Sequence, residues 1–353
     1  MPRVDDSSDP DLGVLEDKTA ALALRSKRTE RARKKAAQRQ EKAALSKAAN
    51  KSLESPQGFL DILPYELVME ILTLLRPSDI FSLLRTSTPF RAFVLQEEER
   101  IAVAVVGLRY SSLAKCFRLP VLVAQIQPPS IQRLLQLPER LDLTTTVHRR
   151  QGYQHIQPPD TAEVCTCLTC TLRWSALAIA VDFAHWQRHL DLGEPIPMIP
   201  RGKFPDWNRE LVAKNKEVVR KALYSPLWHA RVLERHLQST TRSIARHCAN
   251  KGNKRRRFRM TDGDVRSGTD DFLDRSGPPS LDFPWHRDNY YLLETFLPNR
   301  SWSQDSSRWL YMPAEQHDRD IEFVVRWAER RNQVLQQAER EAREQAATPQ
   351  LQA

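Results

Sequence analysis

The chain has 353 residues, 41% of them hydrophobic and 28% charged, a balance typical of a folded body that carries polar extensions. No segment approaches the roughly 18–20 consecutive apolar residues of a membrane helix, and acidic residues stand where a secretory signal would be basic and then apolar. Five cysteines, an odd and low number, argue against a disulfide framework. We therefore expect a soluble intracellular protein, located in the nucleus, the cytoplasm or both.

The net charge of +10 lies mainly in one N-terminal segment. Between Arg25 and Lys51 there are eleven lysines and arginines against two glutamates, which leaves the rest of the chain close to neutral. A basic groove spread over the folded body, as expected of a nucleic-acid-binding domain, is therefore not indicated. We predict a disordered acidic tail at residues 1–24 and a basic, partly helical arm at residues 25–55.

The basic arm has three interpretations. Its charges can simply keep an exposed helix solvated, since charge runs usually face solvent. It is also typical of a nuclear-import signal, in which the candidate residues are Arg31, Arg33, Lys34 and Lys35. Direct binding of nucleic acid is the third interpretation. It underlies an alternative function, that of a nuclear nucleic-acid-associated protein.

Residues 56–105 predict three short helices joined by tight turns. Pro64 suits the start of the first helix, because the N–H that proline lacks has no partner there. Apolar residues then recur three and four positions apart and form one helical face, made of Leu67, Val68, Ile71, Leu72 and Leu75. Arg76 and Pro77 end this helix. The next two helices present the faces Ile80, Leu83 and Leu84, and Phe90, Phe93 and Val94.

A unit of about forty residues buries too little surface to be stable alone and tends to need a partner. Its apolar side chains also exceed what one small core can use. The pattern therefore predicts a helical module that presents a hydrophobic face to another protein. The alternative is that these helices are simply the start of a larger helical domain.

This segment resembles the F-box. The family pattern is matched by Leu63-Pro64-Tyr65-Glu66-Leu67, Ile71-Leu72, Asp79-Ile80 with Leu83-Leu84, and Phe90-Arg91, with a departure at Thr86-Ser87-Thr88. The resemblance implies that the first two helices pack on a Skp-type adaptor, which connects to a cullin and a ubiquitin-conjugating enzyme. The adaptor contacts that it implies are those of Leu63, Pro64, Leu67, Ile71, Leu72, Ile80 and Leu84.

The rest of the chain predicts a mostly α fold. Residues 106–160 are expected to form a proline-punctuated connecting region, residues 161–335 a helical C-terminal body and residues 336–353 a frayed tail. Within the body, residues 172–190 are long and apolar enough to form a central buried helix. Residues 160–320 also resemble the C-terminal parts of uncharacterised F-box proteins of filamentous fungi, in the strings GEPIPMIPRGK, LDFPWHRDNYYLLETFLPNRSW and PAEQHDRDIE.

Together these resemblances imply a substrate-recruiting F-box subunit of an SCF-type (Skp–cullin–F-box) ubiquitin ligase. The F-box would dock on the Skp-type adaptor, and the C-terminal body would bind a protein substrate. Such a subunit is a non-catalytic receptor, so we expect no enzymatic activity. Nucleic acid and membranes are not expected partners.

The body contains cysteines and histidines at the spacing of a zinc finger. Cys167 and Cys170 precede His185 and His189, and Cys165 could replace either histidine. The residues between them are apolar, whereas a DNA-reading helix exposes polar and basic side chains. Buried free thiols, which pack as small hydrophobes, explain the cysteines without a metal. We therefore predict no cofactor and well under one zinc ion per chain, with these residues as the alternative metal ligands.

Two other groups of polar residues were considered. The run Lys251–Arg259 is interpreted as an exposed loop, with a second import signal or a contact for an acidic partner as alternatives. Histidines and aspartates near the C-terminus invite a catalytic interpretation, but salt-bridged loops explain them more simply. These residues are His286, Asp288, His317, Asp318 and Asp320.

Overall fold

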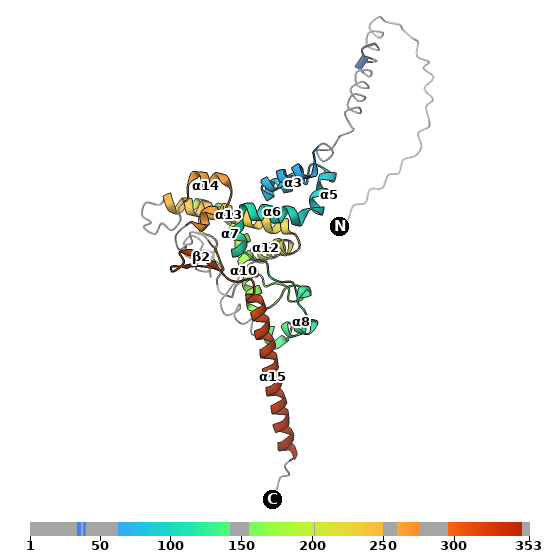
Figure 1. The fold of residues 1–353 in the computed structure, drawn as a ribbon, viewed down its shortest axis with the longest axis vertical. Coiled ribbons are helices and arrows are strands. Elements are labelled where there is room, and N and C mark those ends of the chain that lie inside the picture. The colour runs from blue at the N-terminus through green and yellow to red at the C-terminus, as the bar shows by residue number, and fades with distance from the viewer. Residues whose placement is uncertain are drawn as a thin grey trace, which may run out of the picture. The chain divides into compact units, whose positions relative to one another are not determined.

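The computed structural model describes residues 34–36, 38–39, 63–141, 155–200, 202–249, 260–275 and 296–347. The chain divides into two units, Met1–Ile62 and Leu63–Ala353, and all elements below belong to the second. This unit is mostly helical, which confirms the predicted fold class, and it includes a two-stranded hairpin (Figure 1). No helix among the described residues is long and apolar enough to cross a membrane. The predicted acidic tail and most of the basic arm lie outside the described residues.

The three short helices expected near the start of the unit are present. They are α3 (Tyr65–Leu74), α4 (Pro77–Leu83) and α5 (Thr88–Gln96). Pro64 immediately precedes α3, and Pro77 is the first residue of α4, where proline suits a helix start. The Ser87 hydroxyl accepts a hydrogen bond from the Phe90 N–H and so caps α5. We refer to α3, α4 and α5 as the three-helix module.

The core of the unit forms around one long helix, α13. This helix packs against α4, α6, α7, α10, α11 and α12. The long elements around it are α6 (Glu98–Arg109), α10 (Leu168–His185), α12 (Asp206–Tyr224) and α13 itself (Pro226–Ala249). The predicted central buried helix is confirmed in α10, where Trp174, Leu177 and Ile179 are at most 2% exposed.

The three-helix module is joined to the body by buried polar contacts. The Ser78 N–H and hydroxyl donate to the two carboxylate oxygens of Glu234 in α13, at 2.9 and 2.6 Å. Within the body, Glu98 of α6, the helix that follows the module, accepts hydrogen bonds from the Ser225 hydroxyl and the Leu227 N–H at the start of α13. Module and body therefore share one core and are not separated by a linker.

The remaining described elements are short, apart from α15. They are α7 (Ser111–Cys116), η1 (Val123–Gln125), α8 (Pro129–Leu135), α11 (Gln187–Leu192), α14 (Asp262–Ser267), η2 (Asp271–Asp274), β1 (Arg300–Ser303), β2 (Arg308–Tyr311) and α15 (Gln316–Ala347). The strands pair antiparallel, with Trp302 opposite Trp309. The proline-punctuated connecting region expected at residues 106–160 thus contains α7, η1 and α8.

The last helix, α15, corrects the expectation of a frayed tail from residue 336. It continues without a break to Ala347, because its distal part is rich in Ala, Glu, Gln and Arg, which favour helix. Only its first part packs on the body, against α8 and α10, through Ile321, Val324 and Ala328 (Figure 1). Beyond Arg331, every described side chain is exposed.

Candidate functional site

Helix α3 carries apolar side chains on two different faces. Val68 and Leu72 are each 1% exposed and belong to the inner face, where α3 packs against α6. Leu67, Ile71 and Leu74 are 45%, 39% and 57% exposed, and they follow one another at helical spacings of four and three residues. We call Leu67, Ile71 and Leu74 the α3 row. A contiguous row of large aliphatic side chains in solvent is typical of a docking surface.

The start of α3 is held in place by a polar network that the sequence pattern did not indicate. The Tyr65 hydroxyl donates to the Glu97 carboxylate at 2.8 Å and accepts from Arg100 at 2.7 Å. The hydrogen bond to Glu97 raises the pKa of Tyr65. The Tyr65 ring also meets the edge of Phe93, with centroids 5.8 Å apart. These contacts connect α3 to α5 and α6 and fix the direction in which the α3 row faces.

Five of the seven expected adaptor contacts are accessible in the structure. Pro64, Leu67 and Ile71 are exposed, and Leu63 and Leu84 are half-buried. Four of the five lie along or immediately before α3, so they can meet the same partner.

Leu72 and Ile80 require a correction. They are 1% and 0% exposed, because Leu72 belongs to the inner face of α3 and α4 packs Ile80 into the core beside α13. A buried side chain cannot reach a partner while the chain stays folded, so the structure assigns both residues to the core. Leu74, which was not among the expected contacts, lies on the accessible surface instead.

A groove of about 700 Å³ lies between the three-helix module and the body. Its apolar lining includes Phe81 of α4, Leu84 immediately after α4, Leu95 of α5 and Trp228 of α13, with the Phe81 and Trp228 rings 4.9 Å apart. Its polar lining is basic and consists of Arg85, Arg91, Arg231 and Arg235.

The charge of this groove is largely unbalanced. Arg231 pairs with Glu234, but Arg85, Arg91 and Arg235 form no ion pair with any described residue. Burial, together with the charges of Arg231 and Arg242, lowers the pKa of Arg235, as expected in a region of positive potential. The groove can therefore hold an apolar segment that also carries negative charge.

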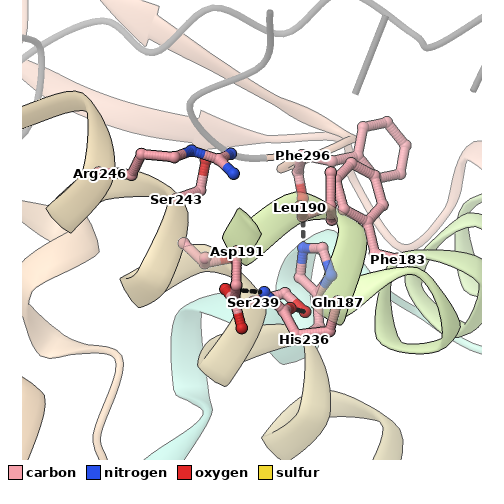
Figure 2. Close-up of a pocket in the computed structure, with 10 residues that line it drawn as sticks. Phe183, Gln187, Leu190, Asp191, His236, Ser239, Ser243, Arg246 and Phe296 are labelled. Carbon is pink, nitrogen blue, oxygen red and sulfur yellow. Dashed lines mark hydrogen bonds between the residues drawn. The ribbon is translucent and has the colours of Figure 1, made fainter. Parts of the chain in front are cut away.

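A smaller pocket lies between α10, α11 and α13 (Figure 2). His236 is buried there against the rings of Phe183 and Phe296, and its Nε2 donates to the Phe296 carbonyl at 2.6 Å (Figure 2). Burial lowers the pKa of His236 to about 4, so the ring is neutral at pH 7. The nearby Ser239 hydroxyl donates to Gln187 and not to the histidine. This geometry fits a packing role for His236.

A third group of residues gathers thiols and an imidazole. Cys165, Cys167, Cys170 and His317 are all buried, and their ligand atoms lie within 4.8 Å of one another. The Nδ1 atom of His317 lies 4.0 Å from the sulfur of Cys165 and 3.4 Å from each of the other two sulfurs. We call these four residues the thiol–imidazole cluster. The predicted burial of the thiols is confirmed, but their histidine neighbour was not predicted.

His185 and His189 do not join Cys167 and Cys170, so the structure does not bring the alternative ligand set together. His185 ends α10 whereas Cys170 lies in its first turn, and a helix rises about 1.5 Å per residue, which separates the two by roughly 22 Å. Both histidines instead lie edge-on to Trp186, with ring centroids 4.8 Å apart.

The structure describes only some residues of the other candidate groups. Of the candidate import signal, Lys34 and Lys35 lie in a described, exposed helical stretch, while Arg31 and Arg33 lie outside the described residues. The run Lys251–Arg259 and the pair His286 and Asp288 also lie outside them. Asp318 is exposed, and Asp320 accepts a hydrogen bond from the Thr169 N–H at 2.7 Å, beside the thiol–imidazole cluster.

Comparison with known proteins gives one match. No curated protein and no solved structure matches the chain, so the relationship of its C-terminal region to fungal F-box proteins stays a prediction. Residues 60–101 match the family model of the F-box domain, a range that includes α3, α4 and α5. The chain therefore carries an F-box domain, formed by the three-helix module that presents the α3 row.

Proposed function

We propose that this chain is the substrate-recruiting F-box subunit of an SCF-type ubiquitin ligase and that the α3 row binds the Skp-type adaptor. The observation that carries this proposal is the exposure of Leu67, Ile71 and Leu74 within the residues that match the F-box. F-box domains typically bind Skp-type adaptors and are not themselves catalytic. The chain would bring a protein substrate to the ligase and leave the chemistry to the other subunits.

The α3 row is large enough to contribute strongly to adaptor binding. Its three side chains are each roughly half exposed. If a partner covers the exposed surface of one of them, the complex is stabilised by about 1 kcal/mol at about 25 cal/mol per Å². Truncation of a central interface residue often costs about 2 kcal/mol, which weakens binding some thirtyfold. Replacing all three together should therefore abolish stable docking.

The contacts between module and body suggest how docking would orient the substrate. Ser78 and Glu234 join α4 of the module to α13 of the body, and within the body Glu98 holds α6, the helix that follows the module, to the start of α13. The body would therefore be carried in a fixed orientation relative to the adaptor. A receptor of this kind holds its substrate at a defined position with respect to the ubiquitin-conjugating enzyme.

Affinity purification from cells tests the docking role. The variant L67A/I71A/L74A should lose the Skp-type adaptor and the cullin, which the parent should retain in high salt. Val103→Ala is the matched control, because Val103 is 67% exposed on the neighbouring helix α6. Adaptor recovery that is unchanged in the triple variant contradicts the proposal. Salt-labile recovery of nucleic acid in place of the adaptor would favour the alternative function.

For the substrate side, we propose that the groove between module and body accepts an acidic, apolar segment. The support is its apolar lining together with Arg85, Arg91 and Arg235, which form no ion pair with another residue that the structure describes. A labelled peptide of alternating Glu and Leu should bind the parent, and its Lys counterpart should not. Charge reversal of the three arginines should abolish binding without loss of the adaptor, whereas Arg209→Glu, at an exposed side chain of α12, should have no effect. Equal binding of both peptides contradicts this assignment.

A further inference from the structure

The thiol–imidazole cluster is assembled from two distant parts of the chain. Cys165 and Cys167 belong to the segment before α10, Cys170 lies in the first turn of α10, and His317 lies in the first turn of α15. The four side chains are at most 9% exposed. Burial of cysteines alone needs no special explanation, since free thiols are among the most buried side chains. The position of one histidine nitrogen close to all three sulfurs, in contrast, needs an explanation.

The separations within the cluster are those of a tetrahedral zinc site. Zinc lies about 2.3 Å from thiolate sulfur and about 2.0–2.1 Å from imidazole nitrogen, so the edges of a regular tetrahedron are about 3.5–3.8 Å long. The three distances from sulfur to His317 Nδ1 are 3.4, 3.4 and 4.0 Å. All six pairs of ligand atoms fall within 4.8 Å. One ion placed among them would lie close to all four ligand atoms.

Backbone amides point at each of the three sulfurs. The Cys167 N–H lies 3.4 Å from the sulfur of Cys165, and the Cys170 N–H lies 3.4 Å from the sulfur of Cys167. The Val121 N–H lies 3.3 Å from the sulfur of Cys170. A protonated thiol is a weak acceptor, whereas a thiolate accepts strongly and is the form that binds metal. Donors of this kind orient metal ligands and stabilise their charge.

The start of α10 and a buried arginine place positive charge beside the cluster. Cys167 is the N-cap of α10, an eighteen-residue helix whose positive end faces the cluster. Arg140 is 7% exposed and donates to the side chain and carbonyl of Thr166, the residue between Cys165 and Cys167. Three thiolates, a neutral imidazole and one Zn²⁺ carry a net charge of −1, which the Arg140 guanidinium can balance.

The apolar residues around the thiol–imidazole cluster indicate what a metal bound to it would do. A small apolar cluster around the cysteines is completed by Ile126, Leu135, Ile321 and Val324, from η1, α8 and α15. This cluster is where the long helix α15 attaches to the body. Because few apolar residues share this task, a metal ligand at the first turn of α15 would strengthen the attachment considerably.

We propose that Cys165, Cys167, Cys170 and His317 bind one structural zinc ion, which fastens the start of α15 to the N-terminal end of α10. With four protein ligands the coordination sphere is complete, and no open position remains for a substrate. The site is therefore structural. The expectation of metal-free thiols rested on packing, and the alternative ligand set paired Cys167 and Cys170 with His185 and His189; in the present proposal His317 supplies the fourth ligand.

Elemental analysis of the full chain, purified without chelator, is the test. The parent should contain one zinc per chain. The variants C167S/C170S and H317Q should contain close to none, while H185Q/H189Q should retain the parent's content. His317→Cys keeps a ligand in place and should retain zinc, so it distinguishes loss of a ligand from loss of the fold.

Cobalt substitution and chelation give independent readouts. The cobalt-loaded parent should show the intense visible bands of tetrahedral coordination with thiolate charge transfer, and these bands should shift in the His317→Cys variant. Chelation should lower the melting temperature of the parent and leave that of C167S/C170S unchanged. A parent without zinc whose melting is insensitive to chelator overturns the proposal. Zinc that persists in H317Q but is lost in H185Q/H189Q overturns this ligand set.

Discussion

Leu67 and Leu72 lie on the same helix, but their substitution by alanine should affect different properties: adaptor binding for Leu67 and stability for Leu72. Leu72 is 1% exposed, so its truncation removes buried methyl groups and leaves a cavity, which costs about 2–5 kcal/mol of unfolding free energy. Leu67 is 45% exposed, and its truncation should change stability by no more than about 0.5 kcal/mol. If the α3 row binds the adaptor, Leu67→Ala should weaken that binding by about thirtyfold, equal to about 2 kcal/mol.

Two measurements on the same purified proteins separate these effects. Urea unfolding followed by circular dichroism gives the unfolding free energy, and calorimetric titration with the Skp-type adaptor gives the affinity. Leu72→Ala should lower the unfolding free energy. At temperatures where the variant is folded, its affinity for the adaptor should be nearly unchanged. The reasoning fails if Leu72→Ala is as stable as the parent, or if it weakens adaptor binding more than Leu67→Ala does.

Two further predictions concern the body. Glu234→Gln should lower the unfolding free energy by about 2 kcal/mol in urea titrations, because the buried carboxylate holds Ser78 and Arg231. The control Glu322→Gln, in an exposed ion pair, should change the unfolding free energy by less than about 0.5 kcal/mol. Equal effects of the two substitutions would contradict this prediction. Burial raises the pKa of Asp270 to about 7, so its contribution to stability is complete below pH 4 and is lost as the pH rises towards 7. The unfolding free energy of Asp270→Asn should therefore rise relative to that of the parent between pH 4 and pH 8, by at most about 4 kcal/mol. A difference in unfolding free energy that does not depend on pH would contradict the raised pKa of Asp270.

The sequence predicted the three-helix module well because its signals are local. Prolines at helix starts and apolar residues at three- and four-residue spacing act within one or two turns, and α3, α4 and α5 form where they were expected. The choice of the outer face could not be predicted in the same way. Leu67 and Ile71 are as apolar as Val68 and Leu72, and only the packing of α6 decides which pair is covered.

The thiol–imidazole cluster shows the same limit more strongly. The spacing of Cys170 and His185 suggested proximity, but the α-helix between them holds them at its two ends. His317 reaches the cysteines across about 150 residues of chain, through a tertiary contact between α10 and α15. No local pattern carries that information. The sequence did contain one hint, since three cysteines within six residues offer three ligands and leave a fourth to be found.

The most direct test of the proposed docking surface is hydroxyl-radical footprinting of the chain with and without the Skp-type adaptor. Oxidation of Leu67, Ile71 and Leu74, read by mass spectrometry, should fall sharply in the complex, because their exposed surface becomes covered. Oxidation of Phe323, which is 68% exposed on α15, should not change. A stable complex in which the α3 row stays as reactive as in the free chain would contradict the account.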